Sequence, residues 1–222
     1  LGGVANLGIG TTSPAYQLTL SSNSTFWEAG LQTTVTGGNQ SLKIISDAHG
    51  GGGRTGDIKF FTNGAADENV KMHIDNTGAV TMPLQPAFLA RPSGTQSNLA
   101  LNASTTIAFG TEVFDQNADF ASNTFTAPVA GRYLLTTGLY AQSLDHDTTY
   151  YQLELVTSNR IFYNILSMSG FDADVLHYSF PISVLADMDA SDTVFVRMAI
   201  PNAGAAQADV SSVSHFSGHL VA

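Results

Sequence analysis

Short segments of alternating hydrophobic and polar residues run through most of the chain, and turn residues separate them. Alternation with a period of two is the pattern of a β-strand that has one buried and one exposed face. In the second half of the chain the turns recur at fairly regular intervals, which is typical of a β-sandwich. No amphipathic helix of useful length is predicted, apart from a turn or two in the N-terminal part. The strands predicted in the second half are 105–110, 124–128, 132–142, 149–156, 160–166, 176–185, 193–200 and 214–222.

The first part of the chain carries the same pattern more loosely. Residues 70–74 alternate cleanly, and residues 79–82 resume extended chain after a turn at residues 75–78. The turn is predicted because Asn and Gly tolerate the positive φ that it needs. Two further segments are predicted as strands, residues 42–46 and 57–62.

Three prolines, Pro83, Pro86 and Pro92, lie between these two parts. Proline is disfavoured in a central strand, so a linker or a first edge strand is predicted there. We therefore divide the chain into a β-rich region over residues 1–85 and a β-sandwich over residues 86–222.

Two short motifs in the first region resemble the recurrent turn modules of bacteriophage tail fibres. The resemblance implies that residues 1–85 form a β-rich, intertwined shaft or neck of a trimeric fibre. The residues of one motif are Met72, Ile74, Asp75, Gly78 and Val80, and those of the other are Gly8, Ile9, Gly10, Thr11, Thr12 and Pro14.

The second region resembles the globular head of complement's first component, because aromatics at wide spacing precede a Pro-Val-Ala-Gly turn and an alternating strand. The matching positions are Phe109, Asp115, Phe120, Phe125, Gly131 and Tyr133, with further matches at residues 192–196 and 216–220. The interval from Phe120 to Phe125 is two residues shorter than usual in that family, and two later aromatics are replaced by Leu135 and Thr137. The resemblance implies an all-β, ten-strand-type jelly-roll sandwich of the tumour-necrosis-factor-like kind, assembled as a homotrimer.

Charge is scarce in this chain. Charged residues make up 12%, about half the roughly 25% of a typical soluble domain, which suits subunits packed side by side. The net charge is −10 and no basic cluster is present, so binding to nucleic acid is not expected and an anionic membrane surface would repel the protein. No run approaches about 18 apolar residues, so no membrane insertion is expected.

The chain has no cysteine, which excludes thiol catalysis and leaves stability to burial or assembly. It begins at Leu1, with no basic start followed by an apolar run. We expect it to be a C-terminal piece of a longer protein.

Catalytic motifs are weak. Residues 51–56 satisfy the dinucleotide-binding fingerprint literally, but a strand-like segment follows where a helix is needed, so a hairpin or loop is favoured. No nucleophile elbow, Walker lysine or His-Glu-x-x-His motif is present. We expect no enzyme and no required cofactor; a glycan-degrading fibre would need a carboxylate pair about 5–10 Å apart across a groove.

Two loops carry paired acids, Asp145 with Asp147 and Asp172 with Asp174. Carboxylates supply the hard oxygen ligands that calcium prefers. The complement-type resemblance implies a calcium ion at the trimer apex, with Asp172 and Asp174 in approximately the matching loop. The alternative, which we favour, is that these are solvated turn acids.

Three aromatics near these loops, Tyr150, Tyr151 and Phe171, are candidates for binding a sugar. A ring covers the apolar face of a sugar while neighbouring polar groups, here Asp145 and Asp147, take its hydroxyls. The alternative is core or interface packing, which we favour for at least two of the three.

Two histidines, His215 and His219, lie four residues apart on a predicted strand. They share a face but are separated by about 13 Å, so one chain cannot chelate a metal with both. Three copies of one histidine around a threefold axis are able to bind a metal or an anion. An ordinary, partly buried strand histidine is the favoured interpretation.

Taken together, these features predict the receptor-binding tip of a trimeric phage tail fibre, located in the virion and acting outside the cell. Its partner would be a host cell-surface glycan or an outer-membrane component. The alternative is a secreted or surface structural protein of cellular origin with the same trimeric head, for example in a bacterial surface or spore-coat filament.

Overall fold

The computed structural model describes residues 57–62, 70–201 and 208–222. The chain divides into two compact units, Leu1–Arg54 and Thr55–Ala222, and every element below belongs to the second. The predicted strand at 42–46, the motif at 8–14, the fingerprint at 51–56 and the expected N-terminal helical turn lie outside the described residues. The predicted boundary between residues 85 and 86 stays a prediction.

A three-stranded antiparallel sheet is formed by β1 (Ile58–Phe61), β2 (Val70–Ile74) and β3 (Val80–Thr81). The turn between β2 and β3 is held by Asp75, whose Oδ1 accepts hydrogen bonds from the amides of Thr77 at 2.8 Å and Ala79 at 2.9 Å. Gly78 has a φ of +91°, which a residue with a side chain rarely adopts. The predicted turn at residues 75–78 is confirmed, and these contacts explain why Asp and Gly occupy it.

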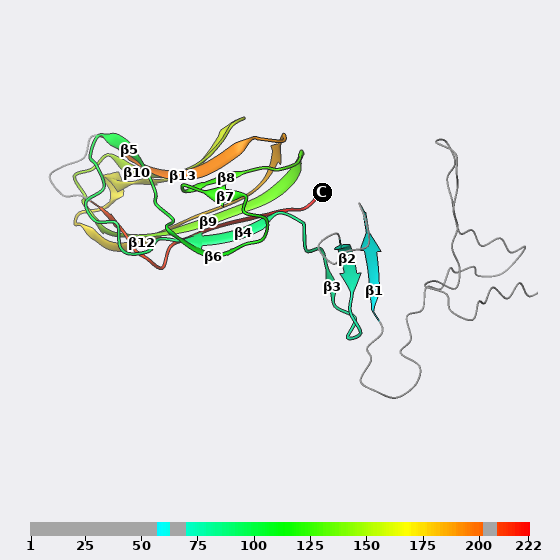
Figure 1. The fold of residues 1–222 in the computed structure, drawn as a ribbon. Helices are drawn as coiled ribbons and strands as arrows, with labels where there is room; N and C mark the ends of the chain where they lie inside the picture. The colour runs from blue at the N-terminus through cyan, green and yellow to red at the C-terminus, as the bar shows by residue number, and fades with distance from the viewer. Residues whose placement is uncertain (1–56, 63–69, 202–207) are drawn as a thin grey trace, which may run out of the picture. The chain divides into compact units, whose positions relative to one another are not determined.

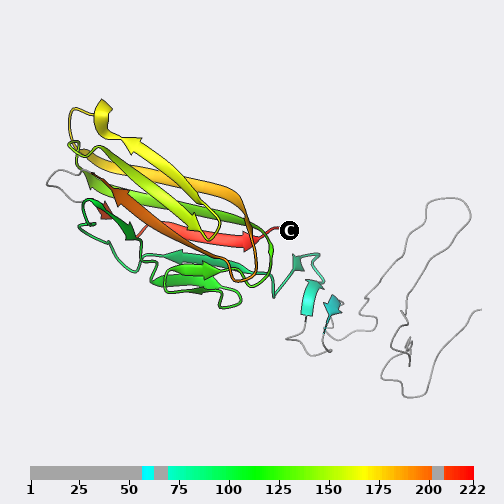
Figure 2. The same cartoon turned by 90° about the horizontal axis from the view of Figure 1, so that it is seen from above.

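Two six-stranded antiparallel sheets face each other in the rest of the described chain (Figures 1 and 2). In both sheets most neighbouring strands are distant in sequence, as in a jelly roll. We call one the β9 sheet: β12 (Val175–Met188), β9 (Gly131–Leu144), β15 (His215–Leu220), β4 (Ala87–Arg91) and β6 (Thr111–Asp115), with β14 (Asp209–Val210) on β9. The other is the β10 sheet: β11 (Ile161–Ser167), β10 (Tyr150–Thr157), β13 (Thr193–Ile200), β8 (Thr124–Thr126) and β7 (Phe120–Ala121), with β5 (Ala103–Thr106) on β13. The predicted all-β jelly-roll sandwich is confirmed.

Helix is sparse in the described residues, where the short 3₁₀ turn η2 (Met168–Gly170) precedes β12. Among these residues no helix combines the length and the apolar character needed to cross a bilayer.

The core between the sheets contains an aromatic cluster. The ring of Phe88 stacks on Phe120 and Phe125 at centroid distances of 4.9 and 4.8 Å. Phe216 meets Phe88 edge-on at 4.9 Å. Offset stacking and edge-on contacts of this kind stabilise beyond the area that they bury. The widely spaced aromatics of the sequence are therefore core residues that β-strands bring together.

The other positions of the complement-type pattern fix the chain around this cluster. Asp115 accepts hydrogen bonds from the backbone amides of Asp119 and Phe120 at 3.1 and 2.8 Å. The hydroxyl of buried Tyr133 donates to the carbonyl of Val129 at 2.8 Å. These hydrogen bonds satisfy two backbone amides and a buried hydroxyl at turns that lead into strands of the sandwich.

Gly131 was expected to serve the turn that precedes its strand, but the structure shows a different reason. A Cβ on Gly131 would lie 2.6 Å from Cδ1 of Leu220 and 2.7 Å from the carbonyl oxygen of Ala222. Glycine is needed because the C-terminal residues pass directly over it, not because its backbone adopts a positive φ.

Three strands, β6, β7 and β14, were not predicted, and a fourth, β5, begins two residues earlier than the predicted segment. β7 and β14 are only two residues long, and β6 is largely exposed along its length, so none of them shows alternation. Pro181 lies inside β12, which is tolerated because β12 is an edge strand paired with β9.

Candidate functional site

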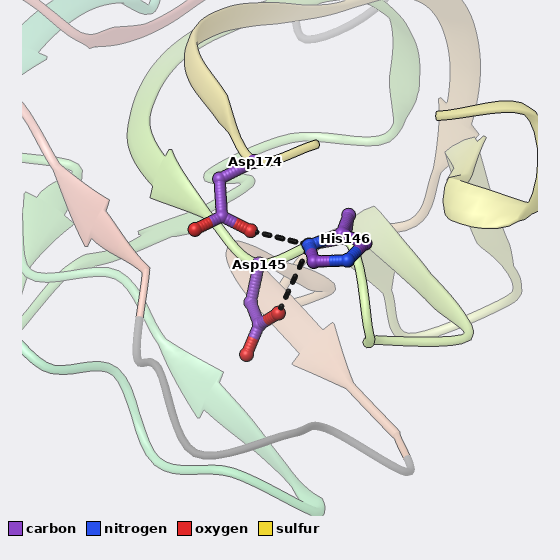
Figure 3. A group of neighbouring side chains, drawn as sticks. All are labelled: Asp145, His146 and Asp174. Carbon is purple, nitrogen blue, oxygen red and sulfur yellow. Dashed lines mark hydrogen bonds and ion pairs between the residues drawn. The ribbon is translucent and has the colours of Figure 1, made fainter. Parts of the chain in front are cut away.

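Two loops with acidic residues meet at one end of the sandwich (Figure 3). Oδ1 of Asp174, just before β12, accepts a hydrogen bond from the backbone amide of His146 at 3.0 Å and lies 2.7 Å from its Nδ1. His146 belongs to the loop between β9 and β10, and its Nδ1 is also 3.9 Å from Oδ1 of Asp145. The histidine therefore joins the two loops.

The β9–β10 loop is built on a buried tyrosine. Tyr151 is 0% exposed, and its hydroxyl accepts a hydrogen bond from the backbone amide of Asp145 at 2.8 Å. Oδ1 of Asp145 in turn accepts from the amide of Asp147 at 2.9 Å, which closes a tight turn. Burial raises the pKa of Tyr151, so its hydroxyl stays neutral. Tyr151 is a core residue that shapes the loop, which agrees with the packing role favoured for at least two of the three candidate aromatics.

His146 and Asp174 perturb each other's ionisation. The hydrogen bond to Asp174 raises the pKa of His146, and the nearby charge of Asp147 raises it further. The same hydrogen bond lowers the pKa of Asp174. His146 was absent from the predicted site residues, although its position between two aspartates was a usable signal for an ion pair.

The cluster of Asp145, His146 and Asp174 offers one ligand atom from each residue, and these atoms lie within 4.8 Å of one another. Calcium prefers six to eight oxygen ligands, whereas one of these three donors is a nitrogen. Asp172 is exposed and is not part of the cluster. The donors of one chain do not fit calcium, so an apical calcium stays a prediction that requires oxygens from neighbouring subunits.

The structure separates the remaining candidates. Asp147 is exposed and lies 3.5 Å from Nε2 of His146, so it belongs with the acidic loops. Phe171 is 38% exposed at the end of η2. Tyr150 is half-buried on β10 and lines a hollow to which neither Phe171 nor Asp147 contributes.

A second feature is the outward face of three neighbouring strands of the β9 sheet, β12, β9 and β15, which carries few charged residues. Arg132 and Asp187 occupy one end of the face, opposite each other on β9 and β12. His215 is half-buried and His219 is exposed, and both lie on the outward side of β15, in agreement with the prediction that they share a face. The outward residues between these limits are Leu134, Thr136, Gly138 and Tyr140 on β9, Ser179, Pro181, Ser183 and Leu185 on β12, and His215, Ser217 and His219 on β15. We call this surface the flat face.

The edge of the sandwich beside the flat face is apolar. β11 is the edge strand of the β10 sheet, and its side chains Ile161, Tyr163 and Ile165 are 46%, 63% and 46% exposed. Leu185 on the neighbouring β12 is 56% exposed. A contiguous apolar edge of this kind is typical of a protein–protein contact. We call it the β11 edge.

The sequence and the fold were compared with those of known proteins. The family model for the C1q domain matches residues 87–221. The globular domain of zebrafish complement 1qA is 16% identical, with a TM-score of 0.46, over 62% of this chain and 98% of that one. Murine APRIL, crystallised at pH 8.5, is 14% identical, with a TM-score of 0.43, over 62% of this chain and 99% of that one.

No curated protein matches the chain. The family match spans more than half of the sequence, from β4 to the end of the sandwich. The chain therefore belongs to the C1q domain family, with the domain at residues 87–221.

Proposed function

We propose that this protein is the receptor-binding tip of a trimeric phage tail fibre, and that its C1q domain attaches to a component of the host cell surface. The observation that carries the proposal is the pairing of a nearly uncharged flat face with the apolar β11 edge on one subunit. Left bare, both surfaces would be adhesive in water. Their burial in an assembly accounts for a chain so poor in charge.

The two surfaces suggest how the subunits associate. The β11 edge of one subunit packs on the flat face of the next, which is a head-to-tail contact. Such contacts close into a ring when the rotation from one subunit to the next is a whole fraction of a full turn. A rotation of one third of a turn gives the trimer that the family resemblance implies. Away from β11, the outward side of the β10 sheet then faces the solvent.

The short sheet of β1, β2 and β3 supports the assignment to a tail fibre. Its β2–β3 turn uses the Asp and Gly of the fibre motif in the roles that the motif requires, since Asp75 accepts the turn amides and Gly78 adopts the positive φ. Residues 1–85 are then the end of the shaft, and the protein is located in the virion. Its partner is a host glycan or an outer-membrane component, and no catalysis is assigned to it.

The assembly is tested by the mass of the protein in solution. We expect light scattering to give about 70 kDa, three times the chain mass of 23.3 kDa, and we expect Thr136→Arg on the flat face to give monomers. The variant places an unpaired charge within each buried contact, where it is costly. Thr106→Arg is the matched control, because Thr106 is exposed on β5 of the other sheet. A monomeric wild-type protein, or trimers of both variants, would contradict the proposed assembly.

The host-surface role is tested with fluorescently labelled protein on panels of bacterial cells, intact or stripped of surface polysaccharide. Attachment to particular strains that is lost on stripping supports a glycan receptor, and attachment that survives stripping supports an outer-membrane component. A trimer that attaches to none of the bacteria, but binds proteins of a cell-surface filament, supports the alternative of cellular origin.

A further inference from the structure

The outward face of the β10 sheet contains a hollow that the acidic loops do not form. Cross-strand pairing places Gln152 on β10 opposite Ala199 on β13, and Ala199 opposite Ser104 on β5. The side chain of Ala199 is short, so the protein surface is recessed at this position, between Gln152 and Ser104. The resulting hollow has a volume of about 510 Å³ and is also lined by Asn102 and Tyr150.

One wall of the hollow is a carboxylate that is already held in place. Glu154 is 6% exposed, and both of its oxygens accept hydrogen bonds, Oε1 from the side-chain amide of Gln152 and Oε2 from Nε of Arg197. A carboxylate paired in this way is fixed before a ligand arrives, so a ligand bond to it costs little ordering. The guanidinium also offsets its negative charge.

The other walls offer an aromatic ring and unused polar groups. Tyr150 is half-buried at the start of β10. Asn102 adopts a φ of 54° immediately before β5, and its backbone amide donates to the carbonyl of Ile200 at 2.8 Å, which fixes the rim. Within the described part of the chain, the side chains of Asn102, Ser104 and Tyr150 make no hydrogen bond to protein.

We propose that this hollow binds one neutral sugar residue of the host glycan, with the ring of Tyr150 covering the apolar face of the sugar. Asn102, Ser104 and Gln152 bind its hydroxyls, and the fixed Glu154 accepts from another. This inference rests on the proposed attachment to a host glycan and names the part of the head that performs it. The hollow lies on the β10 sheet and the flat face on the β9 sheet, so each trimer has three copies of the hollow, each beside the β11 edge of its own subunit.

Charge selects a neutral sugar over an acidic one. The chain carries a net charge of −10, which disfavours a sugar acid. Glu154 is the single carboxylate among the described residues that line the hollow, whereas glycoside hydrolysis uses two. The hollow therefore binds a sugar without cleaving it.

The test is a titration of the wild-type trimer with D-glucose, D-galactose, D-mannose and N-acetylglucosamine, followed by NMR or calorimetry. We expect at least one sugar to bind with a Kd on the order of millimolar. Tyr150→Ala and Ala199→Leu, which remove the ring and fill the hollow, should each weaken binding at least tenfold. Phe171→Ala is the matched control, since it removes an exposed aromatic outside the hollow and should bind as the wild type does. Thermal melts of each variant establish that it is folded.

Binding of none of the four sugars, or equal binding by wild type and a folded Tyr150→Ala trimer, would overturn the sugar site. The cell experiment separates this failure from that of the proposed function. If labelled Tyr150→Ala attaches to stripped and intact cells as wild type does, the head is a receptor-binding tip and the hollow is not its site. If the wild-type trimer attaches to no bacterium, the proposed function itself is wrong.

Discussion

At the scale of single residues, the structure is most informative where neighbours in the sequence take opposite roles. Tyr150 and Tyr151 are adjacent on β10, and successive side chains of a strand point to opposite faces. Tyr151 supports the acidic loop from inside the core, while Tyr150 lines the hollow outside. Both were candidates for binding a sugar, with packing favoured for at least two of the three aromatics, and the alternation of the strand assigns the packing role to Tyr151.

The His146–Asp174 pair makes stability depend on pH. His146 has a raised pKa, so its contribution is fully present below about 6.5, its unfolded pKa, and is lost as the pH rises through the folded value. Asp174 has a lowered pKa, so its contribution is present above its ordinary value of 3.8 and is lost as the pH falls through the folded value. Both contributions are present at about pH 5.5.

We therefore expect His146→Gln to lower the melting temperature at about pH 5.5 and to have a smaller effect at about pH 9, where the imidazole is neutral in both states. His177→Gln is the control, because the ring of His177 stacks on Tyr140 and is not paired with Asp174. A loss of stability that is equal at both pH values would show that the ion pair does not cause it. The measurement is thermal unfolding at fixed protein concentration.

At the scale of elements, close packing between strands decides where glycine is required. Gly218 is the central glycine of the closing strand, and a Cβ there would lie 2.8 Å from both Cδ2 of Leu135 and Cε1 of Phe88. Phe88 is the ring on which the aromatic cluster is built, so a methyl group at Gly218 presses on the core of the sandwich. The family's closing-strand glycine thus has a packing cause.

We expect Gly218→Ala to lower the free energy of unfolding by about 1–3 kcal/mol through overpacking. Gly94→Ala is the matched control, because nothing lies within 4 Å of its Cβ position, and it should change stability by less than about 1 kcal/mol. Urea unfolding at one protein concentration measures both. Equal effects of the two substitutions would argue that Phe88 and Leu135 move aside at little cost.

At the scale of the whole molecule, a weak sugar site becomes useful only through repetition. A single hollow of about 510 Å³ accepts one sugar residue and few contacts, so its affinity is low. In the proposed trimeric fibre, three heads would convert this into firm attachment, since after one head binds, the others meet the surface at a high effective concentration. Assembly and binding are therefore linked.

We expect the monomeric Thr136→Arg protein to keep the wild-type affinity for a free monosaccharide but to lose attachment to host cells by about 10²-fold or more. Flow cytometry with labelled protein measures attachment, and the sugar titration provides the internal control. Undiminished attachment by the monomer would mean that a single head binds its receptor strongly, and that repetition is not the mechanism.

The sequence by itself determined most of the strand-forming segments of the sandwich, the turn at Asp75 and the shortage of charge, because alternation, turn chemistry and composition are local properties. It also carried the aromatic pattern of the C1q domain, although not the reason for it. Only the tertiary structure decided which residues share a site. Glu154 and Arg197 are distant in sequence and become partners through the register of β10 on β13, and Asp174 reaches His146 because two loops end at the same point. Register and loop placement follow from packing across the whole sandwich, so no local pattern specifies them.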